Sequence, residues 1–304
     1  MSNRTDNRAS TEREPSRVNP FTASTRLFCL LGDPVSHSRS PEMMNPALAA
    51  VGIDGVYLAL KVAASDLKNA VAMLKAVGFG GGNVTAPHKE RVARLVDRLS
   101  PGAELSGSVN TLAWDGDALV GHNTDGTGLV RAIEEGSGVP VAKSRILLLG
   151  AGGAARGVIP ALFHAGASEV FVANRTETRA RELADRFGDL GPIMPLPLED
   201  TVLFETGGER DISQFGIVIN ATSARATGGS IAAIDLSRMS SGSLFFDMNY
   251  YHGDDETAGL LKKSGIHHAK GLEMLLFQGV DAFELWTHTH APVSIMRHSL
   301  VFEG

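Results

Sequence analysis

The sequence predicts an α/β fold with parallel sheets, and two observations support this prediction. First, short apolar runs rich in β-branched and aromatic residues alternate with segments of helical periodicity, which is the order of strand–helix–strand units. Second, a glycine-rich turn joins one apolar run directly to a helical segment at 145–166. The chain has 304 residues, of which 43% are hydrophobic. That is enough for one large domain or two domains of ordinary size.

Six apolar runs are expected to form strands, and they lie at 27–31, 56–60, 145–149, 170–173, 217–219 and 244–246. Two of the segments between them have helical spacing, SPEMMNPALAAVG at 40–52 and ETRARELADRFG at 177–188. Gly136, Gly138 and Pro140 interrupt the pattern before the third strand, which predicts a domain boundary at 134–144. Residues 1–24 are polar, poor in aliphatics and without a secretory signal, so they are predicted to form a disordered tail.

Composition argues against several classes of function. The net charge of -6 leaves no basic footprint for nucleic acid, and no apolar run approaches the roughly 20 residues that cross a bilayer. The single cysteine, Cys29, lies in an expected buried strand and has no partner for an internal disulfide, which predicts a cytoplasmic location. His37, His88 and His122 lack metal-ligand spacing and are interpreted as loop residues, so no metal is predicted.

The segment RILLLGAGGAARGVIPALFHAG predicts a nucleotide site. Gly150, Gly152 and Ala155 occupy the positions of a G-x-G-x-x-(G/A) fingerprint, between an apolar strand and a helical pattern. The first glycine allows a tight turn, the second lets a pyrophosphate approach the backbone, and the small third residue lets the helix pack on the strand. The residues expected to surround the pyrophosphate are Gly150, Ala151, Gly152, Gly153 and Ala154.

The end of the next strand, EVFVANRT, indicates which nucleotide binds. An enzyme that uses NAD usually carries an acidic residue there for the ribose 2′-hydroxyl, whereas this chain has Asn174, followed by Arg175 and Thr176, with Arg179 one turn further. Guanidinium groups would bind a 2′-phosphate that a carboxylate would repel. NADP is therefore the predicted cofactor, and a solvated basic helix start is the alternative interpretation.

Four polar stretches remain: GDPVSHSRSP, GGNVTAPHKE, GSVNT and GHNTDGTG. Each is expected where a strand passes into a helix or loop, and each alone is typical of turns and helix caps. Together they supply hydroxyls, amides, one lysine and one aspartate, which suit a small, polyhydroxylated, anionic ligand. The glycines of GFGGGNV, at 78–84, are interpreted as a tight turn at the wall of a cleft.

These four stretches, followed in order by GAGGAAR, NRT, NATS, DMNY and GLEMLLFQGVDAFELW, resemble the motifs of the shikimate dehydrogenase family. The resemblance runs from about residue 27 to about residue 286. It implies a split N-terminal α/β catalytic domain over 25–133 and 270–304, with an NADP-binding Rossmann domain over 134–269 inserted into it. It also implies reversible hydride transfer between NADPH and 3-dehydroshikimate, a step of the aromatic amino-acid (chorismate) pathway.

The resemblance assigns roles to particular residues. The family's catalytic lysine and its partner aspartate match Lys89 and Asp125, although such a pair alone is typical of a structural salt bridge. The groups that hold the substrate match Ser38, Ser40, Thr85, Asn110, Tyr250 and Gln278. The remaining groups along the cofactor match Thr222, Ser223, Met248, Gly271 and Met274.

Spacing adds two geometric expectations. On an extended strand the hydroxyls of Ser38 and Ser40, two residues apart, would point the same way, as two hydrogen bonds to one carboxylate require. In the last helical segment Gly271, Met274 and Gln278 share one face. Because a buried amide without a partner costs about 1–3 kcal/mol, a ligand or backbone partner is expected for Gln278.

The sequence departs from the family at several positions. Met44 stands where a histidine is usual, Ala224 and Arg225 follow NATS, and the loop after Tyr250 is longer. The chemistry is therefore expected to hold, while quinate or another cyclic hydroxy-acid remains an alternative substrate. Two further alternatives are a methylenetetrahydrofolate dehydrogenase and a non-catalytic NADP-binding sensor. The predicted partners are a small-molecule substrate and a possible second copy in a homodimer, with neither nucleic acid nor membrane.

Overall fold

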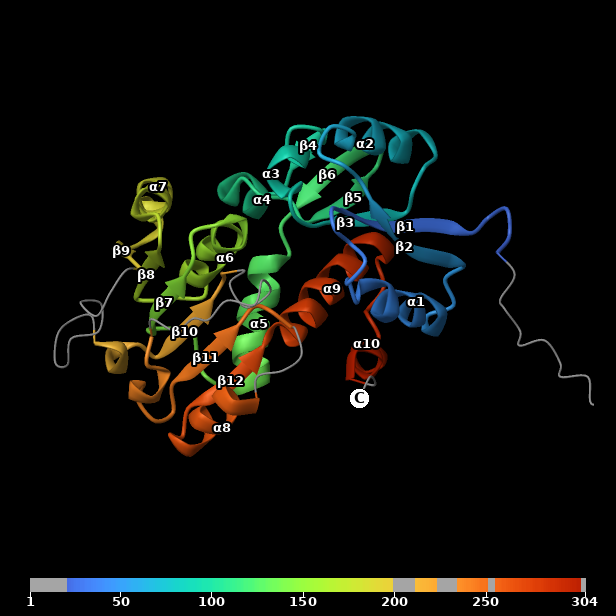
Figure 1. Ribbon diagram of the computed structural model, residues 1–304. Helices are drawn as coiled ribbons and strands as arrows, with labels where there is room; N and C mark the ends of the chain where they lie inside the picture. The colour runs from blue at the N-terminus through green and yellow to red at the C-terminus, as the bar shows by residue number, and fades with distance from the viewer. Residues whose placement is uncertain (1–20, 199–210, 223–233, 251–254, 302–304) are drawn as a thin grey trace, which may run out of the picture.

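The chain forms two lobes, each built on one six-stranded sheet (Figure 1). The structure is a computed structural model that describes residues 21–198, 211–222, 234–250 and 255–301. Strands between residues 26 and 122 form the first sheet, and strands between 145 and 270 form the second. Helices pack against both sheets, so the predicted α/β class is confirmed. All six predicted strands and both predicted helices are present.

The first sheet has the strand order β2-β1-β3-β5-β6-β4. Its strands are β1 (Arg26–Gly32), β2 (Gly55–Lys61), β3 (Gly81–Val84), β4 (Arg98–Leu99), β5 (Thr111–Asp115) and β6 (Ala118–His122). β1 pairs in parallel with β2 and β3, whereas β5 is antiparallel to β3 and β6. β5, which the sequence did not single out, is therefore an exception to the expected parallel pattern. Only residues 116 and 117 separate it from β6, and so short a connection makes a hairpin.

Strand β1 of the first sheet is buried on both faces. Four short helices lie in this part of the chain, α1 (Ser40–Ala50), α2 (Leu67–Ala76), α3 (Lys89–Val92) and α4 (Pro101–Ser106). Phe28 and Leu30 of β1 belong to a core shared with α1, whereas Cys29 and Leu31 belong to a core shared with α2, α3 and α4. A strand covered on both faces is apolar throughout, and this is why the sequence indicated β1 so clearly.

The second sheet is parallel in all of its described pairs and has the order β12-β11-β10-β7-β8-β9. Its strands are β7 (Arg145–Leu149), β8 (Glu169–Asn174), β9 (Ile193–Pro197), β10 (Ile217–Asn220), β11 (Leu244–Asp247) and β12 (His267–Lys270). The helices within this part of the chain are α6 (Gly153–His164), α7 (Glu177–Phe187) and α8 (Asp255–Lys263), and α5 (Asp125–Ser137) leads into it from the first lobe. The chain leaves β7 toward β8 and returns on the other side as β10, and in such sheets ligands bind at the carboxyl ends of the strands at this reversal.

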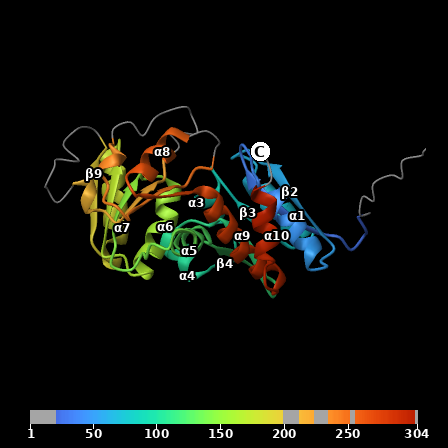
Figure 2. The same ribbon diagram turned by 90° about the horizontal axis from the view of Figure 1, so that it is seen from below.

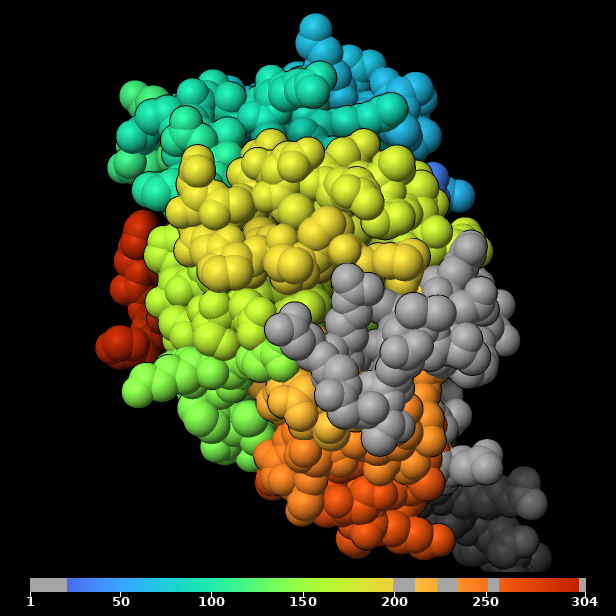
Figure 3. Space-filling view, turned by 90° about the vertical axis from the view of Figure 1, so that its left-hand side faces the viewer, coloured from blue at the N-terminus to red at the C-terminus, as the bar shows by residue number. Residues whose placement is uncertain are grey.

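The chain then returns to the first lobe. α9 (Gly271–Thr287) and α10 (Val293–Val301) join α1 on one face of the first sheet. Trp286 of α9 lies with its ring centroid 5.6 Å from that of Phe28, and its indole nitrogen donates to the Leu112 carbonyl at 2.9 Å. Two views place α5 and α9 between the two sheets (Figures 1 and 2). The lobes also meet where Arg186 of α7 donates to the carbonyl of Leu105 in α4 at 3.1 Å, and Figure 3 shows the yellow α7 segment against the first lobe.

The glycine run of β3 has a different role from the predicted one. A Cβ at Gly80 would lie 2.7 Å from the Phe28 ring, and one at Gly81 would lie 2.2 Å from the Trp286 ring. Gly81 also has φ +150°, which side-chain-bearing residues rarely adopt. The tight-turn interpretation holds only for Gly78, which lies in the turn after α2 with φ +64°. The glycines that follow it enter a buried strand and make room for two aromatic rings.

Two other expectations need adjustment. Residues 1–20 of the predicted disordered tail lie outside the described residues, and beyond them Thr22 and Ser24 donate to the Asp54 carboxylate at 2.7 and 3.3 Å. Gly136 lies inside α5 rather than ending it, and Gly138 is the C-cap of that helix. Among the described residues, no helix is both long and apolar enough to cross a membrane.

Candidate active site

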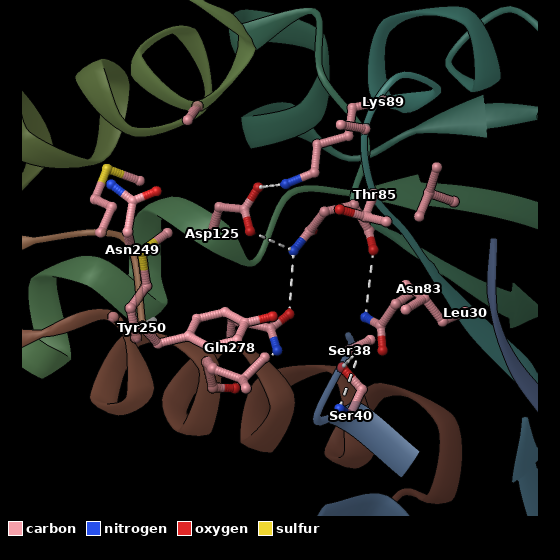
Figure 4. A pocket seen from close by; sticks show the side chains of 18 of the residues that line it. Leu30, Ser38, Ser40, Asn83, Thr85, Lys89, Asp125, Asn249, Tyr250 and Gln278 are labelled. Carbon is pink, nitrogen blue, oxygen red and sulfur yellow. Dashed lines mark hydrogen bonds and ion pairs between the residues drawn. The ribbon is translucent and has the colours of Figure 1, made fainter. Parts of the chain in front are cut away.

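A cavity of about 450 Å³ lies between the two lobes (Figure 4). One wall comes from the loop after β1, from β3 and from the start of α3, and the opposite wall from the loops after β10 and β11. The N-terminal half of α9 completes the lining. The cavity therefore opens beside the carboxyl ends of the second sheet, where the strand order reverses.

Lys89 and Asp125 form an ion pair in this cavity. Lys89 begins α3 and Asp125 begins α5, and the ammonium nitrogen lies 2.6 Å from a carboxylate oxygen (Figure 4). The two side chains are only 22% and 9% exposed. Limited contact with water strengthens the attraction between the charges, and a carboxylate is favoured in the first turn of a helix. The pair is thus held firmly at the point where the lobes meet.

Asn110 connects this pair to α9. Its side-chain nitrogen donates to Asp125 at 2.9 Å and to the Gln278 side-chain oxygen at 3.3 Å. Its oxygen accepts the backbone N–H of Thr124 at 2.7 Å. Gln278 in turn donates to the Leu275 carbonyl at 2.8 Å, so the buried amide has the partners that its spacing led us to expect. These bonds fix the orientation of both amides.

The two serines are adjacent, but not in the predicted way. Ser38 lies in the loop before α1 and Ser40 is the first residue of that helix, so neither belongs to an extended strand. The Ser38 hydroxyl nevertheless donates to the Ser40 hydroxyl at 3.2 Å and accepts the Ser40 backbone N–H at 3.3 Å. A turn, not a strand, brings the hydroxyls together at the cavity wall (Figure 4).

The glycine turn after β7 leaves space beside the backbone. Gly150 has φ +101°, where glycine is favoured. A Cβ at Gly152 or Gly153 would meet no protein atom within 4 Å, although α6 begins at Gly153. The Asn174 side-chain oxygen accepts the Ala151 N–H at 3.2 Å and holds the turn against the end of β8. The open N-terminus of a 12-residue helix beside a pre-formed turn is suited to an anion.

The basic residues after β8 lie at the surface. Arg175, Thr176 and Arg179 are exposed, and neither arginine forms an ion pair with another residue of the described chain. A guanidinium without a protein counter-ion remains available for a phosphate. The positions of Arg175 and Arg179 therefore agree with the prediction that guanidinium groups bind the ribose 2′-phosphate of NADP.

The cavity brings together most of the residues that the sequence singled out. Those in its lining are Ser38, Ser40, Thr85, Lys89, Asn110, Asp125, Ala154, Thr222, Met248, Tyr250, Gly271, Met274 and Gln278. Those at the neighbouring ends of β7 and β8, outside the lining, are Gly150, Ala151, Gly152, Gly153, Asn174, Arg175, Thr176 and Arg179. Ser223 lies outside the described residues.

Sequence reasoning missed several lining residues, notably Leu30, His37, Asn83 and Asn249. Asn83 carried a signal, because it is a polar residue between glycines and valine in a strand that proves fully buried. Asn249 did not, since a polar residue in a loop needs no special explanation. Its amide donates to Asp247 and to the Thr222 carbonyl, both at 2.9 Å, and so ties the loops after β10 and β11 together.

The interpretations of two histidines need correction, and the position of Met44 can now be described. His88 is fully buried, with one ring nitrogen 2.7 Å from the Val62 carbonyl, and is not an ordinary loop residue. His122 ends β6, and burial lowers the pKa of its imidazole. Met44 is packed in the core between α1 and α9 and does not line the cavity. The methionine is therefore not part of the cavity wall.

A parallel sheet with an open glycine turn, separated from a second lobe by a cleft that holds a lysine–aspartate pair, is typical of a nucleotide-dependent dehydrogenase. Comparison with known families agrees. Residues 30–112 match the shikimate dehydrogenase substrate binding domain, residues 134–248 match shikimate / quinate 5-dehydrogenase, and residues 271–301 match the shikimate 5'-dehydrogenase C-terminal domain. The chain belongs to the shikimate dehydrogenase family.

Individual relatives cover nearly the whole chain. Shikimate dehydrogenase (NADP(+)) from Geobacter sulfurreducens is 40% identical over 287 residues, which are 93% of this chain and 98% of that protein. The shikimate 5-dehydrogenase of Listeria monocytogenes, solved with shikimate and NAD, has a TM-score of 0.83 and 31% identity over 94% of this chain and 98% of its own. The enzyme of Thermus thermophilus, solved with NADP(H) and shikimate, has a TM-score of 0.77 and 32% identity over 91% and 98%.

Proposed function

We propose that this protein interconverts 3-dehydroshikimate and shikimate, with NADP(H) as the hydride carrier. The observation that carries the proposal is the Lys89–Asp125 pair, 2.6 Å apart in a cavity that both lobes line. Family membership supplies the class of reaction, and the pair supplies a proton donor at the position where a ketone would be reduced. The aromatic amino-acid (chorismate) pathway is the corresponding metabolic setting.

Lys89 manages the charge that develops during reduction. As the ring carbonyl carbon gains a hydride, its oxygen becomes an alkoxide, and an adjacent ammonium both stabilises that charge and donates a proton to it. Asp125 keeps the ammonium in place through their 2.6 Å contact and has a second oxygen that accepts from Asn110. In the reverse direction the neutral amine accepts the hydroxyl proton. The lysine side chain is 22% exposed, which allows it to exchange this proton with solvent.

Polar groups at the two ends of the cavity orient the substrate. Ser38 and Ser40, whose hydroxyls are 3.2 Å apart, would hold the carboxylate. The ring hydroxyls would be bound by groups that project from several different elements, namely Thr85, Asn110, Tyr250 and Gln278. Fixing an anionic group at one end and the hydroxyls at the other presents one carbonyl to Lys89, and such orientation is a large part of catalysis.

The second lobe has room and partners for NADP, which supplies the hydride when bound. The open Cβ positions at Gly152 and Gly153 support a pyrophosphate at the turn formed by Gly150, Ala151, Gly152, Gly153 and Ala154. The ribose 2′-phosphate would be bound by Asn174, Arg175, Thr176 and Arg179. The nicotinamide end would lie along Thr222, Ser223, Met248, Gly271 and Met274, of which Ser223 lies outside the described residues.

We also propose the organisation in which these parts work. Residues 25–133 and 270–304 would form the substrate domain, 134–269 the NADP domain, and 1–24 a tail. A cytoplasmic location is supported by the single buried thiol of Cys29, whose pKa burial raises to about 12. A homodimer is supported by the sheet edge at β2, which pairs on one side only among the described strands and where Leu58 is 45% exposed, and sedimentation velocity would detect it.

A substrate panel tests this function. NADPH formation, followed by its absorbance, should be fastest with shikimate among shikimate, quinate and related cyclic hydroxy-acids. Quinate is the second candidate, because the family model over 134–248 is described for shikimate and quinate alike. If the protein oxidises quinate but not shikimate, the proposed chemistry stands and the assignment of shikimate as the substrate is wrong. Cofactor binding without oxidation of any of them would support the sensor alternative.

A further inference from the structure

Tyr57 lies behind the cavity and has no role in the proposed chemistry. It belongs to β2, its side chain is wholly buried, and its ring centroid lies 6.0 Å from that of Trp286. Its hydroxyl reaches past β1 to β3 and donates to the side-chain oxygen of Asn83 at 2.8 Å. Asn83 lines the cavity and Tyr57 does not. The phenol can therefore affect a ligand only through its neighbours.

The hydrogen bonds of Asn83 make its orientation depend on that phenol. The side-chain nitrogen donates to the Thr111 hydroxyl at 3.1 Å and to the Asn110 carbonyl at 3.3 Å. Asn83 is only 4% exposed, so its oxygen must find a donor within the protein or in a ligand. Tyr57 is that donor. It fixes the amide of Asn83 with its oxygen on the Tyr57 hydroxyl and its nitrogen on the Thr111 hydroxyl.

The phenol remains a donor over the pH range in which enzymes work. Burial raises the pKa of Tyr57 well above its ordinary value, the thiol of Cys29 raises it further, and a hydrogen bond with Ser40 opposes the rise. Ser40 is also the residue to which the Ser38 hydroxyl donates. Tyr57 thus stands behind two neighbouring parts of the cavity wall, the serine pair and Asn83 (both labelled in Figure 4).

We infer that Tyr57 is a positioning residue for the anionic end of the substrate, because its hydroxyl donates to the Asn83 oxygen, which would otherwise be an unpaired acceptor in the cavity wall. This inference rests on the proposed function. A carboxylate can only accept hydrogen bonds, so a free amide oxygen beside the serine pair would repel it. With that oxygen bound to Tyr57, the carboxylate meets hydroxyl donors and no competing acceptor.

The substitution Tyr57→Phe removes one oxygen atom and keeps the ring against Trp286. Since a buried hydrogen bond is worth a factor of about five to ten in binding, the KM for shikimate should rise roughly five- to tenfold. The KM for NADP and kcat should stay within about twofold, because Tyr57 touches neither the Lys89–Asp125 pair nor the nucleotide turn. A rise in the shikimate KM alone is therefore the expected result.

A matched control separates positioning from general loss of stability. Ser243→Ala removes a buried hydroxyl that donates to the Ser240 carbonyl at 2.6 Å, at the start of β11 and away from the cavity. Both variants should lower Tm, and only Tyr57→Phe should raise the KM for shikimate. If the two variants behave alike, with Tm lowered and both KM values unchanged, Tyr57 is structural and the inference is overturned.

A double-mutant cycle tests whether the effect passes through Asn83. In an Asn83→Ala background the amide oxygen is absent, so adding Tyr57→Phe should raise the KM for shikimate no further. If the two substitutions raise the KM independently, so that their fold-changes multiply in the double variant, the inference is overturned. The wild-type protein distinguishes this result from failure of the proposed function. A wild type that does not oxidise shikimate refutes both, whereas an active wild type with an unaltered Tyr57→Phe variant refutes only the role of Tyr57.

Discussion

Gly81→Ala should destabilise the first lobe strongly, because its Cβ would enter the space of the Trp286 ring. The new atom would lie 2.2 Å from one ring carbon and 2.5 Å from two other ring atoms, where ordinary contact begins near 3.4 Å. The ring is held by the 5.6 Å contact with Phe28 and by its hydrogen bond to the Leu112 carbonyl. It cannot move by the required distance of about 1 Å without breaking one of these contacts.

Two costs add in this variant. Overpacking a core costs about 1–3 kcal/mol, and holding alanine at the backbone conformation of Gly81 costs a further 1–3 kcal/mol or so. The free energy of unfolding should therefore fall by roughly 2–6 kcal/mol, and Tm by about 3–10 °C for a chain of this size. Differential scanning calorimetry measures the change directly.

Gly102→Ala is the matched control, because a Cβ at Gly102 in α4 would meet no protein atom within 4 Å. Its Tm should remain within about 2 °C of the wild-type value, since alanine also favours a helix over glycine. If Gly81→Ala has the same Tm as the control variant, the Trp286 ring and the strand adjust freely to the added Cβ. The account of the glycine run would then be wrong.

Two further predictions concern binding. Replacing Arg175 and Arg179 by alanine should weaken NADP binding by about tenfold or more for each lost charged contact. NAD binding, measured by calorimetry beside it, should stay nearly constant. Equal losses of affinity for both cofactors would make these arginines ordinary surface charges. Replacing Ser38 and Ser40 by alanine should raise the KM for shikimate by about tenfold for each lost hydrogen bond to its carboxylate. The affinity for NADP should be unchanged. If the KM stays at the wild-type value, the carboxylate is bound by other residues.

Hydrophobic burial alone defines some of the strands that the sequence identified. β1 and β7 are continuous apolar runs, covered on both faces. Two of the missed strands carry no apolar pattern: β3 is largely glycine and asparagine, and β12 is HHAK. β3 exists because Phe28 and Trp286 pack against it. Contacts from residues distant in the sequence decided these elements.

The site could be predicted by motif but not in its geometry. Lys89 and Asp125 are 36 residues apart, and only the fold brings their side chains within 2.6 Å. The serine spacing suggested a strand, yet the chain turns into α1 there, which the following proline at position 41 allows. Asn83 and Tyr57 could not be joined from sequence, because their contact crosses an intervening strand.

The steady-state turnover of Lys89→Ala, measured beside its NADP affinity, tests the central claim most directly. The lysine acts where charge develops in the transition state, so kcat for shikimate oxidation should fall by about 10²–10⁴. The dissociation constant for NADP should change by no more than about twofold, because Lys89 lies in the other lobe from the nucleotide turn. A variant that turns over shikimate at close to the wild-type rate would contradict the account.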